Sequence, residues 1–181
     1  MIESDTTLTT LLSPEDYETA NKFCKENLMM DLNMAPKIKP AFLLNNIAVV
    51  AYIKHIGNYN PQEQLDTYFQ TQATQKGKRV DGLETPDFQF NLLYNGISLQ
   101  RQAQLLMCTL NNIDKEVESL KRLTDAYMKQ DLETMLKINE ERKGNQCDAL
   151  PAEENALIYD RNKTWAVSYT HLRAHETELH L

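Results

Sequence analysis

The stretch Lys76-Gly77-Lys78-Arg79-Val80-Asp81-Gly82-Leu83-Glu84-Thr85-Pro86-Asp87-Phe88-Gln89 separates two segments with helical patterns. Gly77 suits the left-handed conformation that ends a helix, because glycine adopts positive φ without steric cost. The residues from Arg79 to Leu83 are enough for one short strand, with Val80 and Leu83 as its buried side chains. The stretch therefore predicts a helix end, a strand, an acidic corner and a new helix.

Glu84 occupies the corner of this stretch. Thr85 and Pro86 form a helix start, with a hydroxyl that can cap the helix and a proline whose missing N–H does no harm in the first turn. Glu84 is therefore expected at the carboxyl end of a strand and beside the positive end of a helix, where ligands bind in open α/β sheets. A carboxylate in this position is also a simple partner of the helix dipole, so both interpretations of Glu84 stay open.

Composition excludes two classes of partner. The chain has 181 residues, suited to one domain, and 41% of them are hydrophobic, which is enough for a core. Its net charge of −7, with both signs interspersed, argues against a nucleic-acid surface. No apolar run is long enough for a membrane span, and no signal-peptide pattern opens the chain. The sequence after Met1 is typical of the interior of a longer protein.

The apolar periodicity predicts an α+β fold that is predominantly helical, with helices around the one short strand. Helices are expected over residues 14–28, 41–56, 60–77, 86–96, 98–113, 116–128, 132–141 and 152–165, and Leu65, Tyr68, Phe69 and Ala73 are expected on a buried face. A lone strand leaves its backbone groups unpaired, so its partner strands are expected to be missing from this chain.

Four stretches together resemble the TraB/GumN family, within the superfamily that includes the Tiki proteases. They are Asn60-Pro61-Gln62-Glu63-Gln64-Leu65-Asp66, Gly77-Lys78 with Leu83-Glu84-Thr85 and Gln89, Leu123-Thr124-Asp125-Ala126-Tyr127, and Tyr159-Asp160-Arg161-Asn162 before Trp165. The resemblance runs from about residue 5 to residue 166. Residues 1–166 are thus expected to be the helical middle of a TraB/GumN-like domain.

The resemblance implies a metal-dependent hydrolase with peptides among its expected substrates. The family carries a Gly-x-x-His motif near each end, and neither motif occurs here. No metal ligand can be carried over, so the chain is expected to bind no cofactor itself and to be inactive, whereas the full-length protein would hold a divalent metal.

Four residues match the inner motifs of the family. Glu84 and Arg161 are the catalytic candidates, and Gln89 and Asn162 are the substrate-binding candidates. A glutamate can act as a base or orient a water, and an arginine can hold an oxyanion or a substrate carboxylate. The alternative is that Arg161 forms a salt bridge to Glu84 and ties the last helix to the strand.

The tail departs from the family pattern. Val167 to Thr177 resembles the translation of a sequencing-library adapter, and residues 167–181 are expected to be non-native. His171 and His175 have helical i, i+4 spacing, but the glutamate of His-Glu-x-x-His does not lie between them, so no metal site is predicted there.

The three cysteines fit no zinc spacing. Cys108 follows an apolar run on a helix, whereas Cys147 lies in a polar loop where a free thiol would be prone to oxidation. A disulfide between them is predicted, with Cys24 left as a buried thiol. The resemblance favours the same pairing, because many relatives look exported to the periplasm, with an export signal that would precede this chain. The alternative is a cytoplasmic protein with reduced cysteines.

A second function class stays open. The helices could form a non-enzymatic module with a groove for a peptide or a partner protein. Tyr52, Tyr59 and Tyr94, with the methionines Met29, Met30 and Met34, could supply such a surface.

Overall fold

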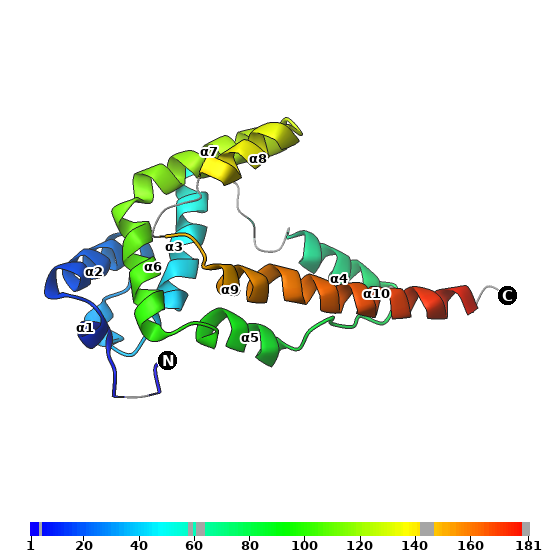
Figure 1. Cartoon of the computed structure of the whole chain (residues 1–181), viewed down its shortest axis with the longest axis horizontal. Helices are drawn as coiled ribbons and strands as arrows, with labels where there is room; N and C mark the ends of the chain where they lie inside the picture. The colour runs from blue at the N-terminus through cyan, green and yellow to red at the C-terminus, as the bar shows by residue number, and fades with distance from the viewer. Residues whose placement is uncertain (4, 58–59, 61–63, 142–146, 179–181) are drawn as a thin grey trace. The chain divides into compact units, whose positions relative to one another are not determined.

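A computed structural model describes residues 1–3, 5–57, 60, 64–141 and 147–178 of the protein, with side chains to residue 171 (Figure 1). Its helices are α1 (Leu8–Leu11), α2 (Pro14–Leu28), α3 (Pro40–His55), α4 (Leu65–Gln75), α5 (Pro86–Asn95), α6 (Leu99–Asn111), α7 (Ile113–Met128), α8 (Leu132–Glu141), α9 (Pro151–Glu154) and α10 (Asp160–Glu178). The chain divides into two compact units, Met1–Tyr59 with Ile97–Asp148 and Asn60–Gly96 with Ala149–Leu181.

The first unit is built on the packing of α3 against α6, with α1 and α2 alongside. Its largest fully buried apolar side chains include Leu8, Leu32, Leu43, Ile47 and Leu106. These side chains come from four separate segments, so burial of apolar surface joins the helices into one core.

Gln102 is the polar exception in this core, with 1% of its surface exposed. Its Oε1 accepts a hydrogen bond from the backbone N–H of Ala41 at 3.2 Å, and its Nε2 donates to the carbonyl of Ile97 at 3.1 Å. The first N–H groups of a helix lack partners within the helix. Gln102 therefore satisfies the start of α3 from inside the core.

Helices α7 and α8 form a hairpin that continues from α6 in the first unit. Ile138 is buried at the contact between them. On the surface, Arg122 Nη1 lies 2.8 Å from Glu141 Oε2, with about two fifths of each side chain exposed, at 43% and 42%. This exposed ion pair adds little to the free energy of unfolding.

The predicted disulfide is present. Cys108 on α6 is bonded to Cys147, 39 positions later, with 5.5 Å between the Cα atoms. The Nη2 of Arg101, also on α6, donates a hydrogen bond to the carbonyl oxygen of Asp148. The segment at Cys147 and Asp148 is thus attached to α6 by both the disulfide and this hydrogen bond. Cys24 is a buried free thiol, as expected, and burial raises its pKa to about 11.

The second unit opens with α4, which ends at Gly77 as the sequence predicts. Gly77 has a φ of +65°, its N–H donates to the carbonyl of Thr74 at 3.0 Å, and the N–H of Lys78 donates to Ala73 at 2.9 Å. These two bonds are those of a Schellman motif, in which glycine allows the helix to end in a left-handed turn.

The predicted strand is wrong. Arg79–Leu83 is an irregular segment, and the part of the chain that the structure describes contains no strand that could pair with it. Val80 and Leu83 are 46% and 48% exposed instead of buried. A single extended segment cannot satisfy its backbone groups in a buried position, so it stays in solvent. Helices are the only regular secondary structure in the described residues.

The expected buried face of α4 is also wrong. Leu65, Tyr68 and Phe69 are all more than half exposed. Helix α4 begins at Leu65, later than the predicted start near Asn60. Residues 61–63 of that start signal lie outside the described residues.

The final helical stretch of the second unit is longer than predicted. It begins with α9, passes through a π-helix at Asn155–Tyr159 and continues as α10 to Glu178. It runs past Ala166 without a break in the helix. The expected boundary between native chain and tail at Ala166 stays a prediction.

None of the helices in the described ranges has both the length and the apolar character that crossing a membrane requires.

Candidate functional site

The site in the second unit starts at the N-terminus of α5. Thr85 caps this helix, since its Oγ1 accepts a hydrogen bond from the N–H of Phe88 at 3.2 Å, and Pro86 occupies the first turn. Glu84 directly precedes the cap. The helix start that the sequence encodes therefore fixes the backbone position of Glu84 even though no strand precedes it.

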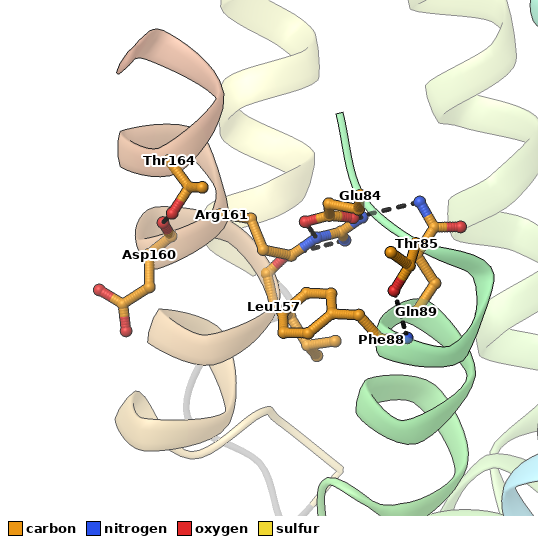
Figure 2. A network of polar contacts seen from close by, with 8 residues as sticks. All are labelled: Glu84, Thr85, Phe88, Gln89, Leu157, Asp160, Arg161 and Thr164. Atoms are coloured by element: carbon orange, nitrogen blue, oxygen red, sulfur yellow. Dashed lines mark hydrogen bonds and ion pairs between the residues drawn. The ribbon is translucent and has the colours of Figure 1, made fainter. Parts of the chain in front are cut away.

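Arg161 on α10 binds Glu84 with two parallel hydrogen bonds (Figure 2). Its Nε donates to Oε1 at 2.9 Å and its Nη2 donates to Oε2 at 2.8 Å. Only 5% of the Glu84 side chain and 20% of the Arg161 side chain are exposed. Bidentate pairing of this kind fixes the relative orientation of the two side chains as well as their distance.

Three neighbours hold the pair in place. Gln89, in the next turn of α5, donates through Nε2 to Glu84 Oε2 at 3.1 Å. The Nη1 of Arg161 donates to the carbonyl of Leu157 at 3.2 Å, one turn earlier, and its guanidinium lies 4.7 Å from the centre of the Trp165 ring, one turn later. Both turns of the final helical stretch that flank Arg161 thus contact its guanidinium.

The electrostatics of the pair favour its ionised form. The hydrogen bonds from Arg161 lower the pKa of Glu84 to about 2, against the opposing effect of burial, and Gln89 contributes in the same direction. The hydrogen bonds to Glu84 raise the pKa of Arg161. Glu84 is therefore charged at neutral pH and is a weak base, because a general base needs a pKa near the working pH.

The four site candidates differ in their surroundings. The structure brings Glu84, Arg161 and Gln89 together, as expected for a shared site. Asn162 is exposed on α10, and within the described chain no hydrogen bond links it to the pair. The catalytic and substrate-binding roles of these residues stay predictions.

The sequence interpretation missed Trp165 as a member of this site. Its indole N–H is buried and has no hydrogen-bond partner within the described part of the chain. The N–H is nevertheless close enough to Glu84 to help lower the pKa of that carboxyl. The spacing from Arg161 to Trp165 is i, i+4, which places the two side chains on one helix face. This spacing is the feature of the sequence from which Trp165 could have been predicted as a neighbour of Arg161.

The residues of the site do not fit a divalent metal. Both Glu84 oxygens already accept hydrogen bonds, and the guanidinium of Arg161 occupies the position that a cation would need. Across the described ranges no three histidine, cysteine, aspartate or glutamate side chains are grouped as metal ligands. The predicted absence of a site at His171 and His175 stays a prediction, because the side chain of His175 lies outside the described residues.

Comparison with known proteins places the chain in a family. Searches of curated protein sequences and of solved structures found nothing that matches the chain. The model of the TraB/PrgY/gumN family matches residues 1–178, which is nearly the whole chain and includes both Glu84 and Arg161. Because this match covers almost all of its length, the chain belongs to the TraB/PrgY/gumN family.

Proposed function

We propose that the full-length protein of which this chain is the middle is a metal-dependent hydrolase, with peptides as the first substrate class to test. The observation that carries the proposal is the pair of Glu84 and Arg161, an ionised and nearly buried carboxylate held bidentately by an arginine next to a helix start. Its divalent metal would be held by ligands outside the described residues. By itself the chain would then bind no metal and cleave no substrate.

In this proposal Arg161 binds the substrate and Glu84 positions Arg161. A guanidinium has five N–H donors, of which three are used here by Glu84 and Leu157. The remaining two can donate to a developing oxyanion or to a substrate carboxylate. Because the pKa of Glu84 is about 2, its contribution is to hold the arginine and its charge rather than to take up a proton.

The two amide candidates take different roles. Gln89 supports Glu84 from α5, so we assign it to the positioning of the pair. Asn162 follows Arg161 on α10 with its side chain exposed, and its amide is the one available for a substrate contact.

An oxidising compartment such as the periplasm is the proposed location. The pairing of Cys108 with Cys147 supports it, because disulfides persist in oxidising environments and are rare in the cytosol. Non-reducing peptide mapping of protein from its own cells tests this proposal. Recovery of reduced Cys147 throughout would favour the cytoplasmic alternative.

The test of the hydrolase starts with the gene. A hydrolase of this kind requires that a Gly-x-x-His motif be encoded on each side of this chain. The protein with those motifs should cleave peptides in the presence of a divalent metal. Arg161→Lys should lower kcat/KM by at least about tenfold, because lysine cannot reproduce two parallel hydrogen bonds. Arg122→Lys, which alters an exposed ion pair of the first unit, is the matched control and should leave the rate unchanged.

A non-enzymatic binding module is the second candidate. The observation that favours it is that Glu84 is fully hydrogen-bonded, as in a purely structural ion pair. Met29 and Met34 are strongly exposed, at 97% and 85%, whereas Tyr59 lies outside the described residues. A gene without the two motifs, or a full-length protein in which Arg161→Lys changes stability but not cleavage, would favour this candidate.

A further inference from the structure

The first unit contains a cavity of about 460 Å³ between α6 and the segment that joins α1 to α2. We call it the α6 groove and define it by Leu12, Asp16, Gln100, Ala103, Gln104, Met107 and Asn111, which are among its lining residues. Its volume lies in the range of small-ligand sites. Glu84 and Arg161 belong to the second unit, so the groove is no part of the site described above.

Three carboxamide side chains form one edge of the groove. Gln100, Gln104 and Asn111 are all exposed, and at 100° per residue they fall within about 40° of one another around α6. They span a rise of about 16 Å along the helix, which matches about five residues of an extended chain. The edge is therefore a row of carboxamides along one helix face.

These carboxamides retain hydrogen-bonding capacity. Gln104 Oε1 accepts from Arg101 Nη1 at 2.9 Å, which leaves its NH₂ group to donate. Gln100 and Asn111 make no side-chain hydrogen bond within the described part of the chain. Each carboxamide carries both a donor and an acceptor, so it can pair with the N–H and the C=O of a peptide main chain at once.

The floor and one end of the groove differ in character from this edge. Leu12, Ala103 and Met107 are buried, at 8%, 3% and 8% exposure, and provide an apolar floor. Methionine adapts its shape to what it contacts. Asp16, half-buried at the start of α2, supplies a negative charge. The described lining has no aromatic ring on which a nucleic-acid base could stack.

We propose that the α6 groove binds an extended peptide segment by its main chain, through Gln100, Gln104 and Asn111. An apolar side chain of the peptide rests on the floor, and a basic side chain lies beside Asp16, in keeping with the net charge of −7. Groups on one side of an extended peptide repeat every two residues, about 6.6 Å, close to the rise of about 6 Å between Gln100 and Gln104, whereas the rise of about 10.5 Å from Gln104 to Asn111 equals about three residues. This binding site does not depend on the proposed hydrolase function.

The experiment uses the full chain labelled with ¹⁵N and the probe acetyl-Ser-Val-Lys-Val-Ser-Val-Ser-amide. Binding is followed by the side-chain NH₂ signals of Gln100, Gln104 and Asn111. Two control probes have the same side chains. Each is N-methylated at every second residue, one at the odd positions and the other at the even positions, which removes those main-chain N–H donors. We expect saturable shifts with the first probe, and at least about tenfold weaker binding for one N-methylated register, from the loss of two or more hydrogen bonds.

Variants separate recognition of the main chain from simple apolar contact. Gln100→Ala combined with Asn111→Ala should weaken binding by at least about fivefold, whereas Gln70→Ala on α4, an exposed carboxamide elsewhere, should not change it. Circular dichroism confirms that the variants keep their helices. The proposal is overturned if the unmethylated peptide does not shift the three NH₂ signals at millimolar concentration. It is equally overturned if both N-methylated probes bind as tightly as the parent peptide.

Discussion

Arg161 Nη2 lies 2.8 Å from Glu84 Oε2 although 77 positions separate the two residues in the chain. The bond joins the start of α5 to α10, and both side chains are largely shielded from solvent. A charge that is removed from water requires a partner with good geometry, and here each charge has one. The pair thus forms a polar link between two segments of the second unit that are distant in the sequence.

The pair should behave as one energetic unit. Glu84→Gln and Arg161→Met should each lower the unfolding temperature of the second unit by at least about 5 °C, because each leaves one shielded group without its partner. The double variant should lose less than the sum of the two. Fluorescence of Trp165, the single tryptophan, reports on this unit.

The ion pair of Arg122 and Glu141 provides the matched control for the single and double variants of Glu84 and Arg161. The corresponding changes there, Arg122→Met and Glu141→Gln, should shift unfolding by less than about 2 °C, because the pair is exposed. Circular dichroism follows this change in the first unit. Additive losses at Glu84 and Arg161, no larger than those of the control pair, would contradict a coupled pair.

Acid should weaken the second unit in a defined range of pH. The pKa of Glu84 falls from an ordinary value of 4.5 to about 2 on folding, so the unfolded chain binds the proton more readily. The stabilisation is fully present above pH 4.5 and is lost as the pH falls toward 2. We expect the unfolding temperature reported by Trp165 to drop across this range. In Glu84→Gln this dependence should be flatter, and an unchanged slope would refute the assignment to Glu84.

Reduction of the disulfide should destabilise the first unit. In the chain-entropy model a loop of this length contributes about 4 kcal/mol, which the Cys108→Ser and Cys147→Ser double variant should lose. Chemical denaturation followed by circular dichroism measures the loss. Cys24→Ala serves as the control for removal of a cysteine outside the bond.

Thiol counting provides an independent test of the same bond. Without reductant, the unfolded chain should show one reactive thiol, that of Cys24, and reduction should raise the number to all three cysteines. In the folded protein Cys24 should react slowly, because it is buried and its pKa is raised to about 11. Labelling of all three thiols before reduction would mean that Cys108 and Cys147 are not paired.

The chain should not bind a catalytic metal by itself. A catalytic zinc site normally uses three protein ligands, and His55 is the one histidine that remains once His171, His175 and His180 are changed to alanine. Calorimetric titration of this triple variant with zinc, manganese or cobalt should show no stoichiometric binding at micromolar concentration. Tight one-to-one binding would disprove this prediction.

The sequence by itself determined the local structure of much of this protein. Gly77 ends α4 and Thr85 caps α5 as predicted, because positive φ and a hydroxyl cap depend on a few neighbouring residues. The family resemblance, which the match over residues 1–178 confirms, brought Glu84 and Arg161 together as candidates before any contact was known.

Only the tertiary structure decided which apolar segments are buried and which polar groups meet. Val80 and Leu83 have the composition of a strand, but a strand needs a partner, and none lies within the described residues. The bidentate geometry at Glu84, with Trp165 against Arg161, depends on how α10 lies against the start of α5. Spacing along the chain cannot specify that contact, because it forms between segments that only folding brings together.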